Sequence, residues 1–309
     1  MPEGDTIFRS ARALHRALAS KVVTRFETGY AHLARVDDNQ TVAGRTVELV
    51  EARGKWLLIF LSGDLILLSH MLMNGSWHIY RVGERWRRRR QDMRIVIETA
   101  DWTAVAFTVP VAEFHSAASL LRKTALPTLG PDLLKEDFNA DQALDRIRRH
   151  AKEEIAVVLL NQRVMAGIGN VFKSEICFAC GVHPFRHVET LSQSQLAAIV
   201  HTSRKFLKAN VTDNAEGQIV TYTGMRRTTG SANETARLWV YGRQRQPCRR
   251  CGTAIQMRKQ GTQARTTYWC PSCQSMELHD SEHQSTEKDS IEDTVEGGPH
   301  SPRHRKTFC

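Results

Sequence analysis

The sequence predicts an α+β protein with its strands in the first third of the chain, its helices in the middle and a small cysteine-bearing unit near the end. Residues 22–110 contain short β-branched and aromatic runs separated by turn residues, a spacing typical of an antiparallel sandwich or barrel. Beyond residue 140, apolar positions recur with helical periodicity. Two Cys-x-x-Cys pairs follow, Cys248/Cys251 and Cys270/Cys273.

The composition favours a polyanionic partner. The chain has 309 residues and a net charge of +10, with 43 Lys and Arg against 33 Asp and Glu. Its last 31 residues hold seven acidic and four basic side chains, so the positive charge lies in the rest of the chain. A basic body of this kind favours nucleic acid, although charge alone leaves an ordinary basic protein equally open.

Neither a membrane span nor a secretion signal is predicted. The chain lacks any run of about 18 apolar residues, and Glu3 and Asp5 interrupt its start, where a signal peptide would be apolar. We therefore expect a cytoplasmic protein without membrane contact, in a compartment that keeps thiols reduced.

A helix is predicted over residues 7–19, capped by Asp5 and Thr6. Seven strands are then expected at 22–26, 46–52, 56–61, 65–69, 77–82, 93–99 and 103–109. The 84–91 segment between two of them carries five arginines. It is interpreted either as a solvated hairpin loop or as a contact with phosphates.

Helices are predicted at 140–150, 153–164, 171–179 and 192–209, after a linker at 126–134. Residues 211–236 are rich in Gly, Thr and Asn and are expected to form a long mobile loop. These observations divide the chain into a β domain at 1–125, a helical domain at 126–236, a cysteine-bearing unit at 237–278 and a disordered tail at 279–309.

The two cysteine pairs predict a structural zinc site. Eighteen residues separate Cys251 from Cys270, a spacing typical of a zinc ribbon. Four thiolates close the coordination shell, so the metal would fold the hairpin and take no part in chemistry. Arg265 and other basic residues between the pairs could hold a phosphate. A further pair, Cys177 and Cys180, has no second pair to complete a site and is best explained as part of the core.

The chain start offers a candidate nucleophile. If Met1 is removed, Pro2 becomes a secondary amine with a pKa near ~7.7–8, against about 10.4 for lysine. A neutral amine can attack an electrophilic carbon to form an iminium, and Glu3 beside it can transfer a proton. A Met-Pro start is also common in proteins without such a role.

Three other segments are candidate ligand contacts. Lys55 follows Gly54 between two expected strands and could reach an active site or a DNA phosphate, although taken alone it is better explained as a solvated lysine. In the 167–170 segment, the Asn170 amide and the N–H groups that begin the next helix could bind a phosphate, or the segment could be an ordinary turn. A hairpin carries Leu72, Met73 and Asn74, which could enter a base stack or belong to the core.

Taken together, these motifs resemble the formamidopyrimidine-DNA glycosylase/endonuclease VIII family. The resemblance rests on the Pro-Glu-Gly-Asp-Thr opening, Gly54-Lys55, the 162–175 stretch and the 265–274 stretch, which occur in the family's order. The opening is similar to that of the endonuclease VIII branch, and the resemblance covers roughly residues 1–275.

The resemblance implies a fold and a set of site residues. The fold would be an N-terminal antiparallel β-sandwich with a capping helix, a helix–two-turns–helix domain and a zinc-ribbon finger. Pro2 would be the nucleophile, Glu3 the general acid/base and Lys55 the third catalytic residue. The DNA contacts would come from Asn170 and Arg265, which grip phosphates, and from the void-filling residues Leu72, Met73 and Asn74.

The implied activity is that of a DNA glycosylase and DNA-(apurinic or apyrimidinic site) lyase in base excision repair. Such an enzyme excises oxidised bases, here oxidised pyrimidines by the opening motif, and cuts the strand by β,δ-elimination. It needs one structural zinc ion and no redox cofactor, and it would act as a monomer on damaged DNA of the nucleoid. The alternatives are a preference for oxidised purines and a non-catalytic protein that binds damaged DNA.

Overall fold

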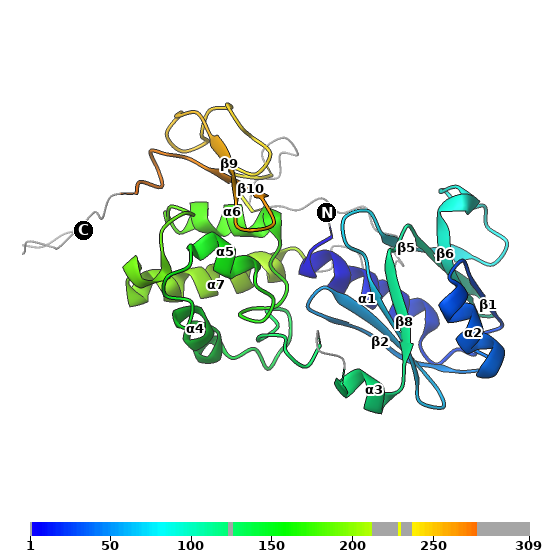
Figure 1. Cartoon of the computed structure of the whole chain (residues 1–309). Coiled ribbons are helices and arrows are strands. Elements are labelled where there is room, and N and C mark those ends of the chain that lie inside the picture. The colour runs from blue at the N-terminus through cyan, green and yellow to red at the C-terminus, as the bar shows by residue number, and fades with distance from the viewer. Residues whose placement is uncertain (1, 123–125, 212–227, 230–236, 277–309) are drawn as a thin grey trace, which may run out of the picture. The chain divides into compact units, whose positions relative to one another are not determined.

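The computed structural model describes residues 2–122, 126–211, 228–229 and 237–276 (Figure 1). Residues up to Met276 form one compact unit. The expected disordered tail and nearly all of the expected 211–236 loop lie outside the described residues.

The N-terminal part is a sandwich of two four-stranded antiparallel sheets, as the sequence predicted. One sheet has the order β1-β6-β7-β5, formed by Arg25–Thr28, Met93–Glu98, Trp102–Phe107 and Ser76–Arg81. The other has the order β2-β3-β4-β8, formed by Val47–Arg53, Trp56–Leu61, Leu65–His70 and Val111–His115. The strands alternate their side chains between the two faces of each sheet, which gives the sandwich one central core.

The central strands of the sandwich are covered on both faces. On β7, Ala104 and Ala106 enter the central core, while Val105 and Phe107 belong to a separate cluster on the outer face. Trp86 packs on that outer cluster. Coverage of both faces explains why the central strands β3, β4, β6 and β7 are nearly continuous apolar runs.

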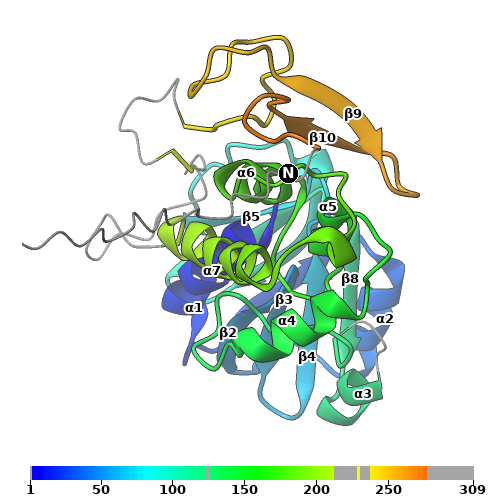
Figure 2. The ribbon, with the colours of Figure 1, turned by 90° about the vertical axis from the view of Figure 1, so that its left-hand side faces the viewer.

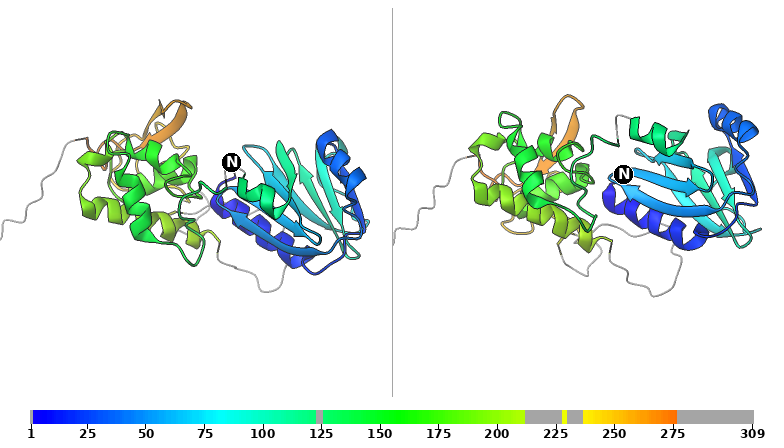
Figure 3. Two further views of the ribbon diagram at one scale, coloured as in Figure 1. Left: turned by 60° about the horizontal axis from the view of Figure 1, so that its bottom comes forward. Right: turned by 90° about the horizontal axis from the view of Figure 1, so that it is seen from below.

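The first helix, α1 (Gly4–Leu18), packs against β2 and β3 (Figure 3). It begins three residues earlier than expected, with Glu3 as its N-cap residue and no side-chain cap. The predicted cap at Asp5 and Thr6 is therefore wrong, because both residues lie buried inside the first turn. The helix extends to Gly4, whose N–H donates to the Gly167 carbonyl oxygen at 2.8 Å.

Two short helices and one strand were not predicted. They are α2 (Ala31–Asn39), α3 (Ala117–Arg122) and β8. Leu33 is the one buried residue of α2, so the helix has no apolar stripe that a periodicity argument could detect. The arginine-rich segment ends in a 3-10 turn, η1 (Arg90–Asp92).

The second part is helical. It contains α4 (Ala140–Arg148), α5 (Ile155–Leu160), α6 (Asn170–Ala179), the 3-10 turn η2 (Val188–Thr190) and α7 (Gln193–Ala209). The expected helix at 153–164 is shorter, since α5 ends at Leu160. In Figure 2, α6 lies beside α7, which it contacts. Every residue of α6 from Asn170 to Phe178 is buried, including the polar ones.

The last described part is the hairpin of β9 (Gln256–Gln260) and β10 (Arg265–Trp269). Its docking depends on Glu175 of α6, which has no solvent exposure. The Glu175 carboxylate accepts hydrogen bonds from the backbone N–H groups of Trp239, Val240 and Tyr241 at 2.8–2.9 Å and from the Thr228 hydroxyl. Burial raises the pKa of Glu175, and the four hydrogen bonds act in the opposite direction.

None of the helices in the described residues is long and apolar enough to cross a bilayer.

We expect Glu175→Gln to destabilise the protein by about 3 kcal/mol, because an amide –NH₂ would face backbone N–H groups and leave buried donors unpaired. Urea unfolding of the zinc-bound chain measures the change. Glu189→Gln, at an exposed position, is the matched control and should change the free energy of unfolding by less than about 0.5 kcal/mol. Equal effects of the two variants would contradict the structural role of Glu175.

Candidate active site

The centre of the site is the buried carboxylate of Glu3, which has no solvent exposure. It accepts hydrogen bonds from the backbone N–H groups of Gly169 at 3.0 Å, Val171 at 2.8 Å and Phe172 at 3.3 Å. These are among the N–H groups that have no partner inside α6, and a carboxylate is favoured at the positive end of a helix dipole. Glu3 thus caps a helix that lies 166 residues or more further along the chain.

Three glycines allow this close approach. A Cβ atom on Gly4 would lie 2.7 Å from the Gly167 Cα atom, and one on Gly169 would lie 2.3 Å from the Glu3 Cδ atom. Gly167 has a φ of +114°, in a region that side chains disfavour. The chain start and the 167–169 turn therefore fit together only with glycine at all three positions.

One expectation about the 167–170 segment is corrected by this contact. In one of the two interpretations of this segment, the backbone N–H groups that begin α6 could bind a phosphate. Those of Gly169, Val171 and Phe172 are bonded to Glu3 instead. The segment can still contact a ligand through the Asn170 side chain.

Asn170 connects α6 to the β9–β10 hairpin. It is 5 % exposed, and its Nδ2 atom donates to the Thr266 hydroxyl at 3.1 Å. Its Oδ1 atom is buried without a hydrogen-bond partner among the described residues. Arg265 directly precedes Thr266 and is half-buried, with Nε donating to Gln263 at 3.1 Å. The structure therefore brings Asn170 and Arg265 together, close to Glu3 and half-buried Pro2.

Sequence analysis did not single out Lys173, which belongs to this cluster. Lys173 is on α6 and is 1 % exposed. Burial and then the positive charge of Arg265 lower its pKa to about 8, while Cys177 and Glu3 act in the opposite direction. Its ammonium group thus lies within electrostatic reach of both Glu3 and Arg265. A single lysine in an apolar helix shows no pattern in the sequence that would identify it.

Lys55 lies in the turn between β2 and β3. A Cβ atom on Gly54 would lie 3.1 Å from the Ala166 Cβ atom, so this turn packs against the residue before Gly167. The Gly54 N–H also donates to Asp132 at 2.7 Å. Lys55 is half-buried.

His70, at the end of β4, is a second residue that sequence analysis missed. Burial, and then the charge of Lys55, lower its pKa to about 4, so the imidazole is neutral at neutral pH. Its Nδ1 atom accepts the Leu72 N–H at 3.1 Å, which places the ring proton on Nε2. His70 therefore lies between Lys55 and the 71–75 turn and holds the backbone of that turn.

The 71–75 turn presents Leu72 and Met73 to solvent. Leu72 is 47 % exposed and Met73 53 % exposed, so the interpretation of these side chains as core residues is wrong. Leu72 has a φ of +45°, a strained conformation for a side chain of this size. Asn74 is also exposed, and its carbonyl oxygen accepts from the Thr108 hydroxyl at 2.8 Å. The turn therefore projects two large apolar side chains and one amide.

The four cysteines meet at one end of the hairpin unit. Their sulfur atoms lie within 4.8 Å of one another, with 3.9 Å between Cys248 and Cys273 and 3.4 Å between Cys251 and Cys270. Tetrahedral zinc with ~2.3 Å bonds requires sulfur–sulfur distances of about 3.8 Å. The donor set and spacing fit one zinc ion. Among the described residues, this is the one group of three or more potential ligands close enough to bind a metal.

The family models match three consecutive parts of the chain. The formamidopyrimidine-DNA glycosylase N-terminal domain matches residues 1–110, and the formamidopyrimidine-DNA glycosylase H2TH domain matches residues 129–221. The zinc finger found in FPG and IleRS matches residues 245–275. This last match covers all four cysteines, so the finger holds one structural zinc ion.

Similar proteins cover the same region. "Probable endonuclease 8 2" of Streptomyces coelicolor is 41 % identical over 89 % of this chain and 94 % of its own length. "DNA-(apurinic or apyrimidinic site) lyase Nei2" of Mycolicibacterium smegmatis is 38 % identical over 89 % of this chain and 99 % of its own.

Among solved structures, Lactococcus lactis Fpg in complex with abasic-site DNA has the same fold. Its TM-score is 0.73 at 23 % identity, over 89 % of this chain and all of that one. From the three matched domains and the relatives at 38–41 % identity, the chain belongs to the formamidopyrimidine-DNA glycosylase/endonuclease VIII family of DNA-repair glycosylases and lyases.

Proposed function

We propose that this chain is a bifunctional DNA glycosylase and DNA-(apurinic or apyrimidinic site) lyase that excises oxidised pyrimidines through its N-terminal proline amine. The observation that carries the proposal is the position of the chain start. Glu3 is bonded to the N-terminus of α6, next to Asn170, Arg265 and Lys173. The Pro2 amine therefore adjoins groups suited to hold a phosphodiester.

The chemistry needs only groups of this chain. Once Met1 is removed, the neutral Pro2 nitrogen attacks C1′ of the flipped nucleotide, and the bond from C1′ to the base breaks with the electron pair leaving on the base. Glu3 is assigned the proton transfer that opens the sugar ring. The product is an iminium between Pro2 and C1′.

Strand cleavage follows from this iminium. Its positive charge acidifies the C2′ proton, and loss of that proton expels the 3′ phosphate by β-elimination. A second elimination expels the 5′ phosphate, and hydrolysis of the iminium regenerates the amine. No electrons enter or leave the system in these steps, so a redox cofactor is not required.

The other site residues are assigned to catalysis, in the case of Lys55, and to DNA binding. Lys55 would complete the catalytic group, while Asn170 and Arg265 would bind the phosphates beside the flipped nucleotide. Leu72 and Met73 are exposed apolar side chains on a strained turn, suited to enter the space that a flipped base leaves. Asn74 would contribute a polar contact at the same place.

Oxidised pyrimidines are favoured over oxidised purines because the Pro-Glu-Gly-Asp opening resembles that of the endonuclease VIII branch, and a relative at 41 % identity carries the endonuclease 8 name. Cleavage of duplexes that contain dihydrouracil or 8-oxoguanine, compared as kcat/KM, tests this assignment. Faster cleavage of the 8-oxoguanine duplex would reassign the lesion class and leave the chemistry unchanged. We further infer a monomer that acts in the cytoplasm on nucleoid DNA.

The free amine can be tested with a removable N-terminal tag. A tag that ends directly before Pro2 turns its nitrogen into an amide, so borohydride trapping on abasic DNA should fall by at least about 10³-fold. Protease removal of the tag, which leaves Pro2 as the first residue, should restore trapping in the same preparation. Efficient trapping by the tagged chain would eliminate Pro2 as the nucleophile.

The contact between Glu3 and α6 can be tested with Gly169→Ala. The added Cβ atom would lie 2.3 Å from Glu3 Cδ, so Glu3 must move and trapping should fall by about 10²-fold. Gly29→Ala is the control, because its Cβ atom would make an ordinary contact at 3.5 Å. Wild-type trapping by a folded Gly169→Ala protein would show that the position of Glu3 is unimportant for the reaction.

Zinc should be required for DNA binding. Cys251→Ser should remove the ion and unfold the hairpin that carries Arg265 and Thr266, with loss of affinity for abasic DNA of at least 10-fold. Zinc content by mass spectrometry and DNA affinity measure the two effects. Cys180→Ser changes the same residue type outside the finger and should retain one zinc ion per chain. Full zinc content in Cys251→Ser would contradict the assignment of this ligand.

A further inference from the structure

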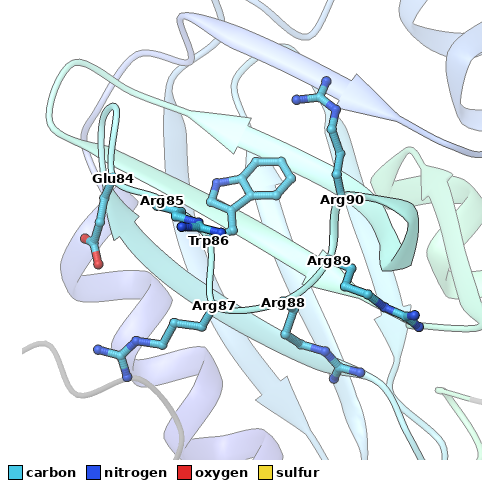
Figure 4. Close-up of a pocket in the computed structure, with 7 residues that line it drawn as sticks. All are labelled: Glu84, Arg85, Trp86, Arg87, Arg88, Arg89 and Arg90. Atoms are coloured by element: carbon cyan, nitrogen blue, oxygen red, sulfur yellow. The ribbon is translucent and has the colours of Figure 1, made fainter.

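The segment 84–90, here called the arginine loop, connects β5 to η1 and has no role in the site described above. It contains Arg85, Trp86 and four consecutive arginines from 87 to 90, with Glu84 as its one acidic residue. Its residues line a hollow of about 470 Å³ (Figure 4). Five guanidinium groups in six residues repel one another unless anions neutralise them.

The arginine loop is held in one place by Trp86. The indole ring stacks on Tyr80 with a centroid separation of 6.5 Å and meets the edge of Phe107 at 5.7 Å. The Arg87 N–H donates to the Tyr80 hydroxyl at 3.2 Å. Trp86 thus fixes the backbone of the arginine loop on the outer face of strands β5 and β7. The arginine side chains therefore lose less conformational freedom when they bind a ligand.

Strand register places the loop beside the 71–75 turn. Thr108 connects the two segments, because its N–H donates to the Asp92 carbonyl oxygen and its hydroxyl donates to the Asn74 carbonyl oxygen, both at 2.8 Å. Arg88 Nη1 donates to the Ser76 hydroxyl at 3.3 Å. Ser76 is two residues beyond Asn74, a reach of ~7 Å in extended chain. The arginines and the exposed turn therefore share one end of the sheet.

Three of the arginines point to the same side of the loop. In Figure 4, the side chains of Arg87, Arg88 and Arg89 extend to one side, and Arg90 extends to the other. Arg90 binds Glu27 at 2.9 Å. The Arg89 side chain is 75 % exposed and makes a 3.5 Å contact with Asp92. Arg87 and Arg89 are exposed, whereas Arg88 is half-buried, with its guanidinium group bonded to Ser76 and 5.8 Å from the Phe107 ring centroid. The row of guanidinium groups formed by Arg87, Arg88 and Arg89 therefore has an anchored member between two exposed ones.

We propose that this row binds the phosphodiester backbone of duplex DNA beside the lesion. The inference rests on the proposed function, since it takes the 71–75 turn as the part that enters the vacated base position. Because Arg88 bonds Ser76, two residues beyond Asn74, the row lies near the turn. Phosphates repeat every ~3.4 Å of helix axis along one strand, so the row would meet phosphates a few base pairs from the lesion. Contacts of this kind fix the position of the protein on DNA and carry no sequence information.

The test is the salt dependence of binding to a long duplex that carries a stable abasic-site analogue. Neutralising three phosphates contributes about −2.7 to the slope of log K against log salt concentration. We expect Arg87→Gln/Arg88→Gln/Arg89→Gln to reduce the magnitude of the slope by that amount. Lysine at the same three positions should restore it, because lysine still neutralises a phosphate, whereas a packing role of the guanidinium groups would not be rescued.

A matched control separates local contacts from net charge. Arg35→Gln/Arg148→Gln/Arg149→Gln removes the same charge at exposed positions on and beside α2 and α4, and its slope should stay near that of the wild type. Shortening the duplex to about four base pairs on one side of the lesion and then on the other locates the contact. The difference between wild type and the loop variant should disappear for one of the two truncations.

Two results would overturn the proposal. One is an equal slope for the loop variant and the wild type on the long duplex, and the other is an equal loss in the loop variant and the control. Borohydride trapping, measured in parallel, keeps the two proposals distinct. If neither the wild type nor the variants form a borohydride-trapped complex but the salt slope changes as expected, the arginine loop binds DNA and the proposed chemistry fails. If trapping is normal and the slope is unchanged, only the loop inference fails.

Discussion

The structure depends on the hydrogen bonds between the Glu3 carboxylate and the first turn of α6. A buried carboxylate is costly unless it is fully bonded, and a buried helix start is costly unless its N–H groups find partners. Here each group satisfies the other. The contact fixes the chain start, which in most proteins is poorly ordered, against the second half of the molecule. The reaction proposed for the Pro2 amine needs such an anchor, because catalysis requires a defined distance to the reacting carbon.

Helix α6 serves the site along its whole length. Its first turn bonds Glu3, and Asn170 and Ser174 bond the β10 residues Thr266 and Tyr268. Glu175 holds the segment that leads to the hairpin. Polar side chains are buried throughout this helix because each of these contacts is made to another part of the chain. The short distance between the chain start and Arg265 follows from this arrangement, although 263 residues separate them in sequence.

Much of the fold was predictable because its determinants are local. Each expected strand of the sandwich from β2 to β7 was found within one or two residues, since apolar runs and turn residues bound them. The cap of α1 was wrong because a long-range bond, that of Gly4 to Gly167, decides where the helix begins. Helix α2 was missed because one buried leucine makes no pattern.

The site was predictable only where a motif marks it. His70 and Lys173 are single residues whose environments depend on neighbours further away in sequence, Lys55 for the first and Glu3 and Arg265 for the second. The hydrogen bonds between Glu3 and residues 169–172 could not be predicted either, because the sequence does not show which partners a buried carboxylate will find. The sequence motifs did locate both sides of that contact, since the chain start with Glu3 and the 167–170 segment were each identified as candidate sites.

The separation of 166 residues between Glu3 and its first helix partner has a consequence for biosynthesis. A ribosome that adds ~5–20 residues per second makes the α6 N-terminus on the order of 10–30 s after Glu3. Throughout that interval the nascent chain start has no partner to bury it and stays open to an aminopeptidase. The removal of Met1 that the proposed function requires would thus be separated in time from the later burial of Glu3 by the order of translation.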